Sequence, residues 1–252
     1  MIDIMDWISN QFEKTRGKNM KRRFGLMFFA FILILSLGLA GCNNESGGKK
    51  TGGESGSDGG SSSGGTLVFG RGGDSTSLDP AVTTEGEAFK VTKNIYETLI
   101  EFGEQDTEIQ PGLAESWEES TDGLKHTLKL RKGVKFHDGT DFNAEAVVFN
   151  FERWKAGNKE QFYYYNSQFG DVIKEVKAVD EHTVEFTLNR ILAPFYKNLA
   201  MSPFGIASPA AIEKHGEKFI ENPVGTGPFK FKEWKRNDRV TLVKNEDYWK
   251  EG

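Results

Sequence analysis

The chain has 252 residues, of which 37% are hydrophobic and 27% are charged, and its formal net charge is −5. With 20 Phe and 5 Trp, this composition excludes a disordered chain, and the negative charge suggests no basic surface for nucleic acid or anionic lipid. A single cysteine excludes a disulfide within the chain.

The amino terminus has the pattern of an export signal. The basic patch Met20-Lys21-Arg22-Arg23 precedes an uncharged apolar run, Phe24 to Ala40, which is slightly short for a membrane-spanning helix. The next residues, Leu39-Ala40-Gly41-Cys42, resemble the bacterial lipobox, in which the cysteine is acylated and the chain is cut before it. We therefore expect residues 1–41 to be a lipoprotein signal peptide, with translation starting at Met20, and Cys42 to carry lipid. The alternative is an uncleaved membrane anchor with an incidental cysteine.

Residues 42–65 have the composition of a flexible tether that follows the lipidated cysteine. Nine Gly and six Ser lie between Asn43 and Gly65, and such a segment buries too little apolar surface to fold. Cleavage before Cys42 removes six basic and three acidic side chains. The mature chain is therefore more acidic than the full sequence.

The folded part is expected to begin with a strand at 66–69, because Thr66-Leu67-Val68-Phe69 is rich in β-forming residues and ends at a glycine. The next expected element is a helix over 87–101. Thr84 and Glu87 have the spacing of a capping box, and Val91, Ile95 and Leu99 recur at helical spacing.

The following elements alternate between hairpins and helices. An Asp122-Gly123 turn predicts a hairpin from strands at 116–119 and 125–130, and a second hairpin is predicted at 172–179 and 183–188. Between them, Asn143 is the expected cap of a helix that ends near Gly157. Short helices are expected to start at Pro194 and Pro209, the latter capped by Ser208, before strands at 229–235 and 239–244. This order predicts an α+β fold.

Several ordered motifs resemble family 5 of the extracellular solute-binding proteins, the peptide and nickel receptors of bacterial ABC importers. The central motif is LKLRKGVKFHDG at 128–139, and the resemblance covers essentially all of 66–252. The other matching motifs are LDP at 78–80, PGLAESW at 111–117, NAEAVVFNF at 143–151, APF at 193–195, GTGPF at 225–229 and NEDYW at 245–249.

The resemblance implies a two-lobed, periplasmic-binding-protein-like fold of type II, with an extra subdomain inserted in the first lobe. Residues 66–97 would start that lobe, 98–226 would form the inserted subdomain, and 227–252 would return to the lobe. Family members are about twice as long as this chain. We therefore expect a truncated chain that lacks the second lobe.

The resemblance also places a ligand-binding segment at Thr83, Thr84, Glu85 and Gly86. Glu85 could meet a ligand amine, and the backbone of Gly86 could pair with a peptide strand. The alternative is that Thr84 only caps its helix, and the two roles are compatible. In dipeptide-binding members, the partners of the peptide termini come from the second lobe.

Other motifs have a structural interpretation beside the chemical one. His137-Asp138 could suggest a catalytic pair, but adjacent side chains rarely face each other and Asp138-Gly139 favours a turn. The GTG at 225–227 could suggest a phosphate loop, but Pro228 removes a donor, which favours a hinge or crossover. Gly73-Asp74-Ser75 is similar to a hydrolase nucleophile block but has no matching late Asp-x-x-His block. The histidines lack metal-ligand spacing.

These observations predict a lipid-anchored receptor on the outer side of a bacterial cell membrane. It would capture di- or oligopeptides as a monomer and deliver them to the permease and ATPase of an ABC importer, with no cofactor, metal, catalysis or nucleic acid. The nearest alternative is a receptor for nickel or another metal complex. The others are an anchored hydrolase, for which no nucleophile and base are found, and a truncated remnant or interaction module.

Overall fold

The computed structural model describes residues 65–103 and 105–250. The described residues from 66 onward belong to one compact unit. The predicted signal peptide and Cys42 lie outside the described residues, as does the predicted tether except for Gly65.

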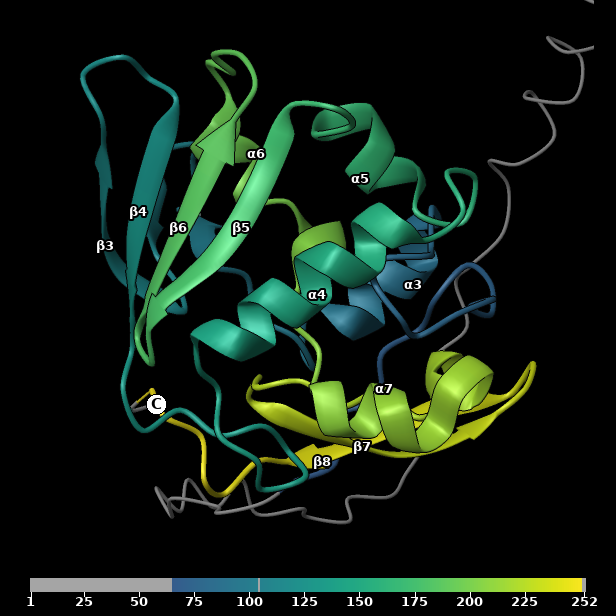
Figure 1. Cartoon of the computed structure of the whole chain (residues 1–252). Helices are drawn as coiled ribbons and strands as arrows, with labels where there is room; N and C mark the ends of the chain where they lie inside the picture. Colours follow the sequence, from purple (N-terminus) through teal and green to yellow (C-terminus); the bar gives the residue numbers. More distant parts are fainter. Residues whose placement is uncertain (1–64, 104, 251–252) are drawn as a thin grey trace, which may run out of the picture. The chain divides into compact units, whose positions relative to one another are not determined.

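An antiparallel four-stranded sheet, in the order β3-β4-β6-β5, forms one side of the molecule (Figure 1). Its strands are β3 (Ala114–Glu119), β4 (Lys125–Leu130), β5 (Ile173–Asp180) and β6 (Thr183–Leu188). Both hairpins predicted from the sequence are therefore confirmed. The two hairpins are joined through their inner strands, β4 and β6, whose pairing places Leu128 opposite Val184.

Helices cover one face of this sheet. They are α4 (Ala144–Ala156), α5 (Tyr163–Gln168) and α6 (Phe195–Leu199). The ring of Phe186 on β6 lies 4.9 Å from that of Phe151 on α4 and 5.4 Å from that of Phe195 on α6, measured between centroids. Because one side chain contacts both helices, α4 and α6 share this face. The buried side chains between helices and sheet form the larger hydrophobic cluster of the described chain.

The caps of α4 and α7 are those predicted from the sequence. The Asn143 side chain accepts a hydrogen bond from the Ala146 N–H at 3.0 Å, and Gly157 follows the last residue of α4. Ser208 accepts from the Ala211 N–H at 3.2 Å at the start of α7 (Pro209–His215). Each cap satisfies a backbone donor that the helix leaves unpaired.

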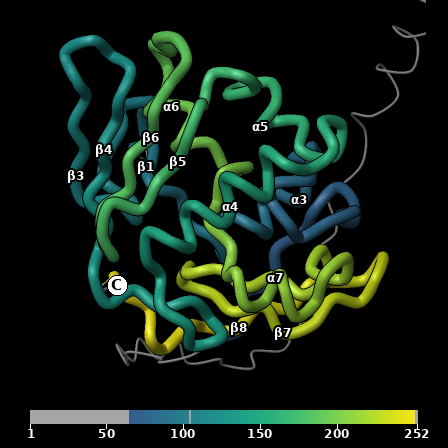
Figure 2. Tube along the Cα trace, in the orientation of Figure 1, coloured from purple at the N-terminus to yellow at the C-terminus, as the bar shows by residue number. Residues whose placement is uncertain are grey.

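A smaller hydrophobic cluster brings together the two ends of the described chain, shown by the blue and yellow parts of the trace in Figure 2. Leu78 and Ile95 pack there with Phe219, while the Leu78 N–H donates to the Ile220 carbonyl at 2.8 Å. The elements on this side include α3 (Gly86–Thr92), α7, the 3₁₀ helix η2 (Gly216–Glu221), and the hairpin of β7 (Phe229–Lys235) and β8 (Arg239–Lys244).

The helices α5 and η2 were not predicted from the sequence, and neither were three other short elements. They are the paired strands β1 (Ile100–Phe102) and β2 (Ile109–Pro111), and the 3₁₀ helix η1 (Ser202–Phe204).

The expected helix over 87–101 is wrong in length, because α3 ends at Thr92. Beyond it, the carbonyls of Asn94 and Ile95 accept hydrogen bonds from the Phe229 and Gly227 N–H groups. Ile95 packs in the smaller cluster, whereas Leu99 packs in the larger one. The helical spacing of these two apolar residues therefore reflects burial in two different cores.

The strand expected at 66–69 does not form. Leu67 and Val68 are 90% and 88% exposed, and the segment pairs with no strand among residues 65–103 and 105–250. A strand is stabilised by a ladder partner as well as by β propensity, so propensity alone misidentified this segment.

Candidate binding segment and hinge network

The predicted binding segment Thr83–Gly86 leads directly into α3. Thr83 is buried and its hydroxyl accepts a hydrogen bond from the Glu85 N–H at 3.3 Å, while Thr84 and Gly86 are exposed. The N-cap of α3 is Glu85, without a side-chain capping bond, so the expected capping role of Thr84 is wrong. Thr84 is thus left as an exposed side chain at the start of the helix.

Glu85 is half-buried, and only one of its two carboxylate oxygens accepts a hydrogen bond in the described part of the chain. Its Oε2 accepts a hydrogen bond from the Thr76 N–H at 3.1 Å, and its Oε1 has no hydrogen-bond partner among the residues that the structure describes. The carboxylate therefore anchors the preceding loop and keeps one oxygen for a further donor.

The loop before this segment is fastened to α3 and to the β7–β8 turn. Arg71 donates to the Ser75 hydroxyl and the Glu87 carbonyl, and Asp74 accepts from Trp234 Nε1 at 2.9 Å and the Asn237 N–H at 2.8 Å. Burial opposes ionisation of Asp74, but these hydrogen bonds outweigh it and lower the pKa of its carboxyl. Asp74 and the buried Ser75 thus connect parts of the fold, which accounts for the Gly73-Asp74-Ser75 motif structurally.

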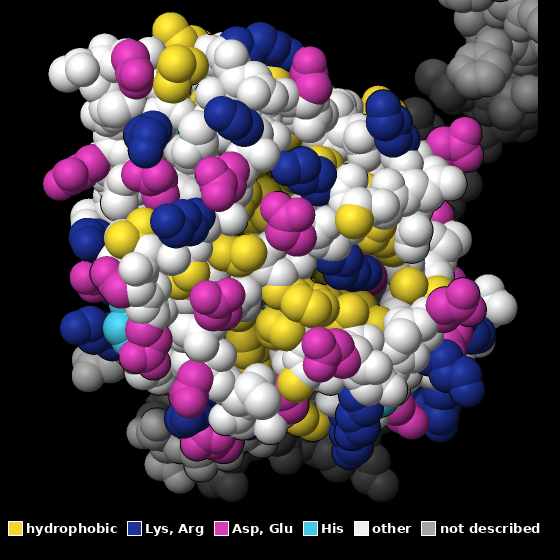
Figure 3. All heavy atoms as spheres, in the orientation of Figure 1, with side chains coloured by type: hydrophobic (Ala, Val, Ile, Leu, Met, Phe, Trp, Pro, Cys, Tyr) yellow, Lys and Arg dark blue, Asp and Glu magenta, His cyan; other side chains and the backbone are white. Residues whose placement is uncertain are grey.

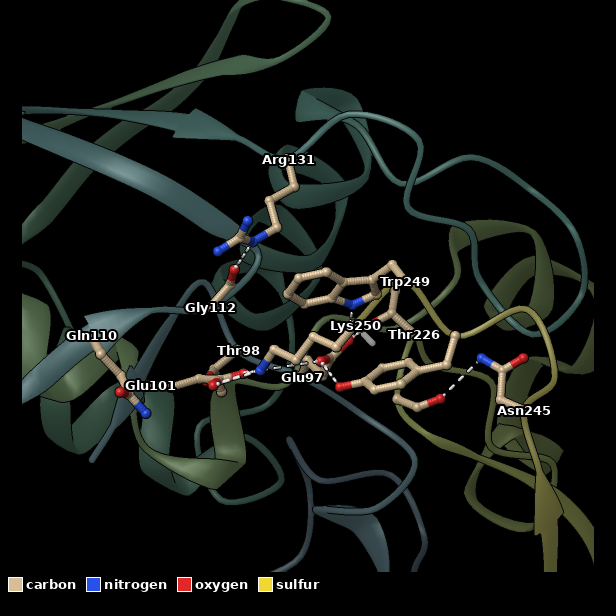
Figure 4. Close-up of polar contacts among 12 residues, drawn as sticks. Glu97, Thr98, Glu101, Gln110, Gly112, Arg131, Thr226, Asn245, Trp249 and Lys250 are labelled. Atoms are coloured by element: carbon tan, nitrogen blue, oxygen red, sulfur yellow. Dashed lines mark hydrogen bonds and ion pairs between the residues drawn. The ribbon is translucent and has the colours of Figure 1, made fainter. Parts of the chain in front are cut away.

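A buried carboxylate, Glu97, lies where several of the sequence motifs meet (Figure 4). Its Oε2 accepts from the Thr226 hydroxyl at 2.8 Å and from Trp249 Nε1 at 2.7 Å, and its Oε1 accepts from the Tyr248 hydroxyl at 2.7 Å. Burial raises the pKa of Glu97 despite these bonds and the nearby Lys250 ammonium, and it also raises that of Tyr248.

Cationic side chains extend this network, which we call the hinge network: Glu97, Glu101, Arg131, Thr226, Tyr248, Trp249 and Lys250. Lys250 Nζ lies 2.9 Å from Glu101 Oε2. The Arg131 guanidinium lies 4.6 Å from the centre of the Trp249 ring, and its Nε donates to the Gly112 carbonyl at 2.7 Å. Figure 4 shows how residues from four of the motifs converge here. Motifs that are far apart in the sequence thus meet at one place in the fold.

The GTG motif at 225–227 crosses the chain at Asn94 and Ile95. A Cβ atom on Gly225 would lie 2.2 Å from the Ile95 carbonyl oxygen, and one on Gly227 would lie 2.8 Å from both the Asn94 and Ile95 carbonyl oxygens. The His137 side chain bonds the Gly227 carbonyl through Nε2 at 2.9 Å. These contacts fit a backbone crossing, as predicted, and involve no phosphate loop.

His137 and Asp138 have different partners, which agrees with the structural interpretation of that pair. Asp138 accepts hydrogen bonds from the hydroxyls of Ser208 and Thr140, both at 2.6 Å. Burial opposes ionisation of Asp138, yet these bonds lower the pKa of its carboxyl. Burial lowers the pKa of the His137 imidazole. Both residues fasten the 136–140 loop to neighbouring segments.

Residues 65–103 and 105–250 contain neither a metal-binding cluster nor a membrane-spanning helix. No group of three or more His, Cys, Asp or Glu side chains there is arranged to hold a metal ion. In the same residues, no helix has the length and apolarity needed to cross a membrane.

Sequence prediction did not identify the hinge network. Thr226, Tyr248 and Trp249 are separated from Glu97 by 129, 151 and 152 positions. The only sequence signal was the presence of polar side chains in the GTGPF and NEDYW motifs that had no proposed chemical role. Buried hydrogen-bond donors need an acceptor, but the sequence does not show which residue supplies it.

Comparison with known proteins places these features in a family. The sequence model of the family described as "Bacterial extracellular solute-binding proteins, family 5 Middle" matches residues 108–252. Heme-binding protein A of Haemophilus influenzae is 36% identical over 235 residues, which cover 85% of this chain and 43% of that protein. The dipeptide-binding protein of Escherichia coli is 38% identical over 206 residues, covering 73% and 38%.

A solved structure shows the same likeness in three dimensions. It is the ABC transporter-associated periplasmic binding protein DppA from Helicobacter pylori in complex with the peptide STSA, with a TM-score of 0.68 and 40% sequence identity. The match covers 74% of this chain and 40% of that chain. The chain thus spans about two fifths of the length of these relatives.

Proposed function

Because the chain belongs to family 5 of the bacterial extracellular solute-binding proteins, we propose that it is part of a receptor that captures peptides outside the cell. The receptor delivers them to the permease and ATPase of an ABC importer without making or breaking a bond. The likeness that carries this proposal is the match to the peptide complex of the Helicobacter pylori protein, at 40% identity.

The fold agrees with this role. The α+β fold predicted from the sequence is confirmed, and it corresponds to part of the type II binding-protein fold. Receptors of this architecture close around their ligand, and closure is driven by contacts that exist only in the closed state. In this proposal the hinge network fixes the junction from which such a movement starts.

We propose a division into a first lobe and an inserted subdomain, in which 66–97 start the lobe as the resemblance implied. Tyr96 packs in the smaller hydrophobic cluster and Leu99 in the larger one, which supports a boundary between them. Ile206 belongs to the larger cluster and Ala207 to the smaller. We therefore place the return to the lobe near residue 207, earlier than the boundary at 226–227.

The ligand segment Thr83–Gly86 is part of the proposal. In the described part of the chain Glu85 Oε1 has no hydrogen-bond partner, so it can accept from a ligand ammonium group, and the exposed backbone at Gly86 leaves room for an extended peptide. Lipid on Cys42 would hold the receptor at the outer face of the membrane, since two acyl chains anchor stably where one does not.

A haem-type ligand is the second candidate, because one relative at 36% identity is a heme-binding protein. Thermal unfolding of the natural protein with Ala-Ala, Ala-Phe, a tripeptide, hemin and nickel–histidine separates these cases. A ligand that binds only the native state raises the unfolding temperature. The proposal predicts a shift with at least one peptide and none with hemin or nickel–histidine. A shift with hemin alone would favour the second candidate.

A further inference from the structure

A groove of about 500 Å³ lies between the outer side of α4 and the start of α7. Figure 3 shows an apolar area in the middle of this face, surrounded by charged side chains. The hinge network contributes no residue to the groove, and neither does the segment Thr83–Gly86.

The floor of the groove is apolar. Val148 and Phe149 line it from α4, and Pro209 and Ala210 line it from α7. Most buried side chains of α4, such as Val147, do not line the groove, whereas Val148 and Phe149 line it and remain partly exposed. An amphipathic helix normally has polar residues on its outer side. Two adjacent apolar residues there leave a surface that association with a partner would remove from water.

The rim of the groove is acidic. It contains the exposed carboxylates of Asp141, Glu145 and Glu152, and no Lys or Arg is among the lining residues. Asp141 forms an ion pair with Lys135, but Glu145 and Glu152 form none with any residue in the described part of the chain. They are seven positions apart on α4, which corresponds to about 10.5 Å along the helix axis.

We propose that the α4–α7 groove docks a cationic segment of a protein partner, in which an apolar side chain lies between two Lys or Arg side chains. The apolar side chain would cover Val148 and Phe149 while the two cations pair with Glu145 and Glu152. An acidic partner would be repelled, and a purely apolar one would desolvate the carboxylates without pairing them. The separation of the Glu145 and Glu152 carboxylates fits two charges on one protein segment. This inference does not depend on the identity of the transported ligand.

A synthetic helical peptide tests the proposal on the natural protein. It carries two lysines seven positions apart with two leucines between them, and the matched control peptide has glutamates in place of the lysines. Fluorescence anisotropy should show saturable binding of the lysine peptide that weakens as salt is added, and no binding of the control peptide. Amide chemical shifts should change in α4 and α7.

Charge reversal then distinguishes the groove from the general acidity of the chain. Glu145→Lys combined with Glu152→Lys should weaken peptide binding at least about tenfold, since two attractions become repulsions. The matched control combines Glu115→Lys with Glu118→Lys, two exposed residues of β3 that do not line the groove. Thermal unfolding confirms that both variants are folded.

Three results would overturn the proposal. The first is an absence of saturable binding by the lysine peptide, and the second is an equal loss of binding in both variants, which would indicate net charge alone. The third is complete displacement of the peptide by an alkyl diamine at equal concentration, which would assign the groove to a small cationic molecule.

Discussion

Glu85 is the one side chain of the proposed ligand segment that carries a charge. Its Oε1 has no hydrogen-bond partner among residues 65–103 and 105–250, whereas Glu87, two positions later, is bound by Lys90 and by the Gly72 N–H. Charge-assisted hydrogen bonds are stronger than neutral ones, so a ligand ammonium group should bind Glu85 in preference to Glu87, whose carboxylate already has partners.

Glu85→Gln should therefore weaken peptide binding by roughly tenfold, because it removes the charge but keeps an acceptor for Thr76. Glu87→Gln is the matched control and should leave affinity unchanged within about twofold. Titration calorimetry on the natural protein measures both. Equal affinity for the two variants would remove Glu85 from the binding site.

Glu97 is the single acceptor that holds the Thr226, Tyr248 and Trp249 donors together. Glu97→Ala leaves all three donors without their acceptor, and this should lower the free energy of unfolding by about 3 kcal/mol. Glu97→Gln keeps a carbonyl acceptor and should lower the free energy of unfolding by less than half of that amount. Urea unfolding monitored by tryptophan fluorescence measures both changes.

The pH dependence of stability gives an independent readout of Glu97. Burial raises its folded-state pKa above the unfolded value, so its contribution to stability is fully present below the unfolded pKa and is lost as pH rises through the folded pKa. The natural protein should therefore gain stability relative to Glu97→Gln as pH falls from neutral toward about 4. A difference that stays constant or changes in the opposite direction would show that the carboxyl is not desolvated.

At the scale of elements, the sequence predicted what local chemistry determines. Asn143 and Ser208 cap their helices through contacts three residues away, and the hairpin turn at Asp122-Gly123 uses local conformational preference. All the residues that determine such a cap or turn lie within a few positions of one another in the sequence. Both caps and both hairpins of the large sheet could therefore be predicted.

The elements that were predicted wrongly depend on distant residues. The chain leaves the helical path after Thr92 because carbonyls at 94 and 95 bond to residues 229 and 227, and Glu97 meets donors more than a hundred positions away. No periodicity or propensity contains that information. The hinge network and the length of α3 therefore required the structure.

The crossing of residues 225–227 over Asn94 and Ile95 depends on close backbone approach. Gly225→Ala places a methyl group against the Ile95 carbonyl and should lower stability by about 2 kcal/mol or more. Gly73→Ala is the matched control, because a Cβ there meets no atom within 4 Å. Thermal unfolding compares the two variants. Equal stability of the two variants would mean that the 225–227 segment can move away from Ile95 without lowering the free energy of unfolding.

At the scale of the whole molecule, the tether and lipid would place the binding unit outside the membrane. Cys42→Ser should abolish incorporation of radiolabelled palmitate, because no sulfur remains to be acylated, and should leave a longer, uncut precursor that keeps the apolar run Phe24 to Ala40. Ser61→Ala, in the proposed tether, is the control and should leave lipidation intact. Palmitate incorporation by the serine variant at position 42 would exclude the lipobox interpretation.

The central claim is that the protein binds peptide reversibly and leaves it chemically intact. Calorimetric titration of the natural, delipidated protein with Ala-Phe, followed by mass spectrometry of the recovered peptide, tests it most directly. The account predicts saturable binding of one peptide per protein and full recovery of unchanged Ala-Phe. Absence of binding by Ala-Phe and by longer peptides, or recovery of free alanine and phenylalanine, would contradict it.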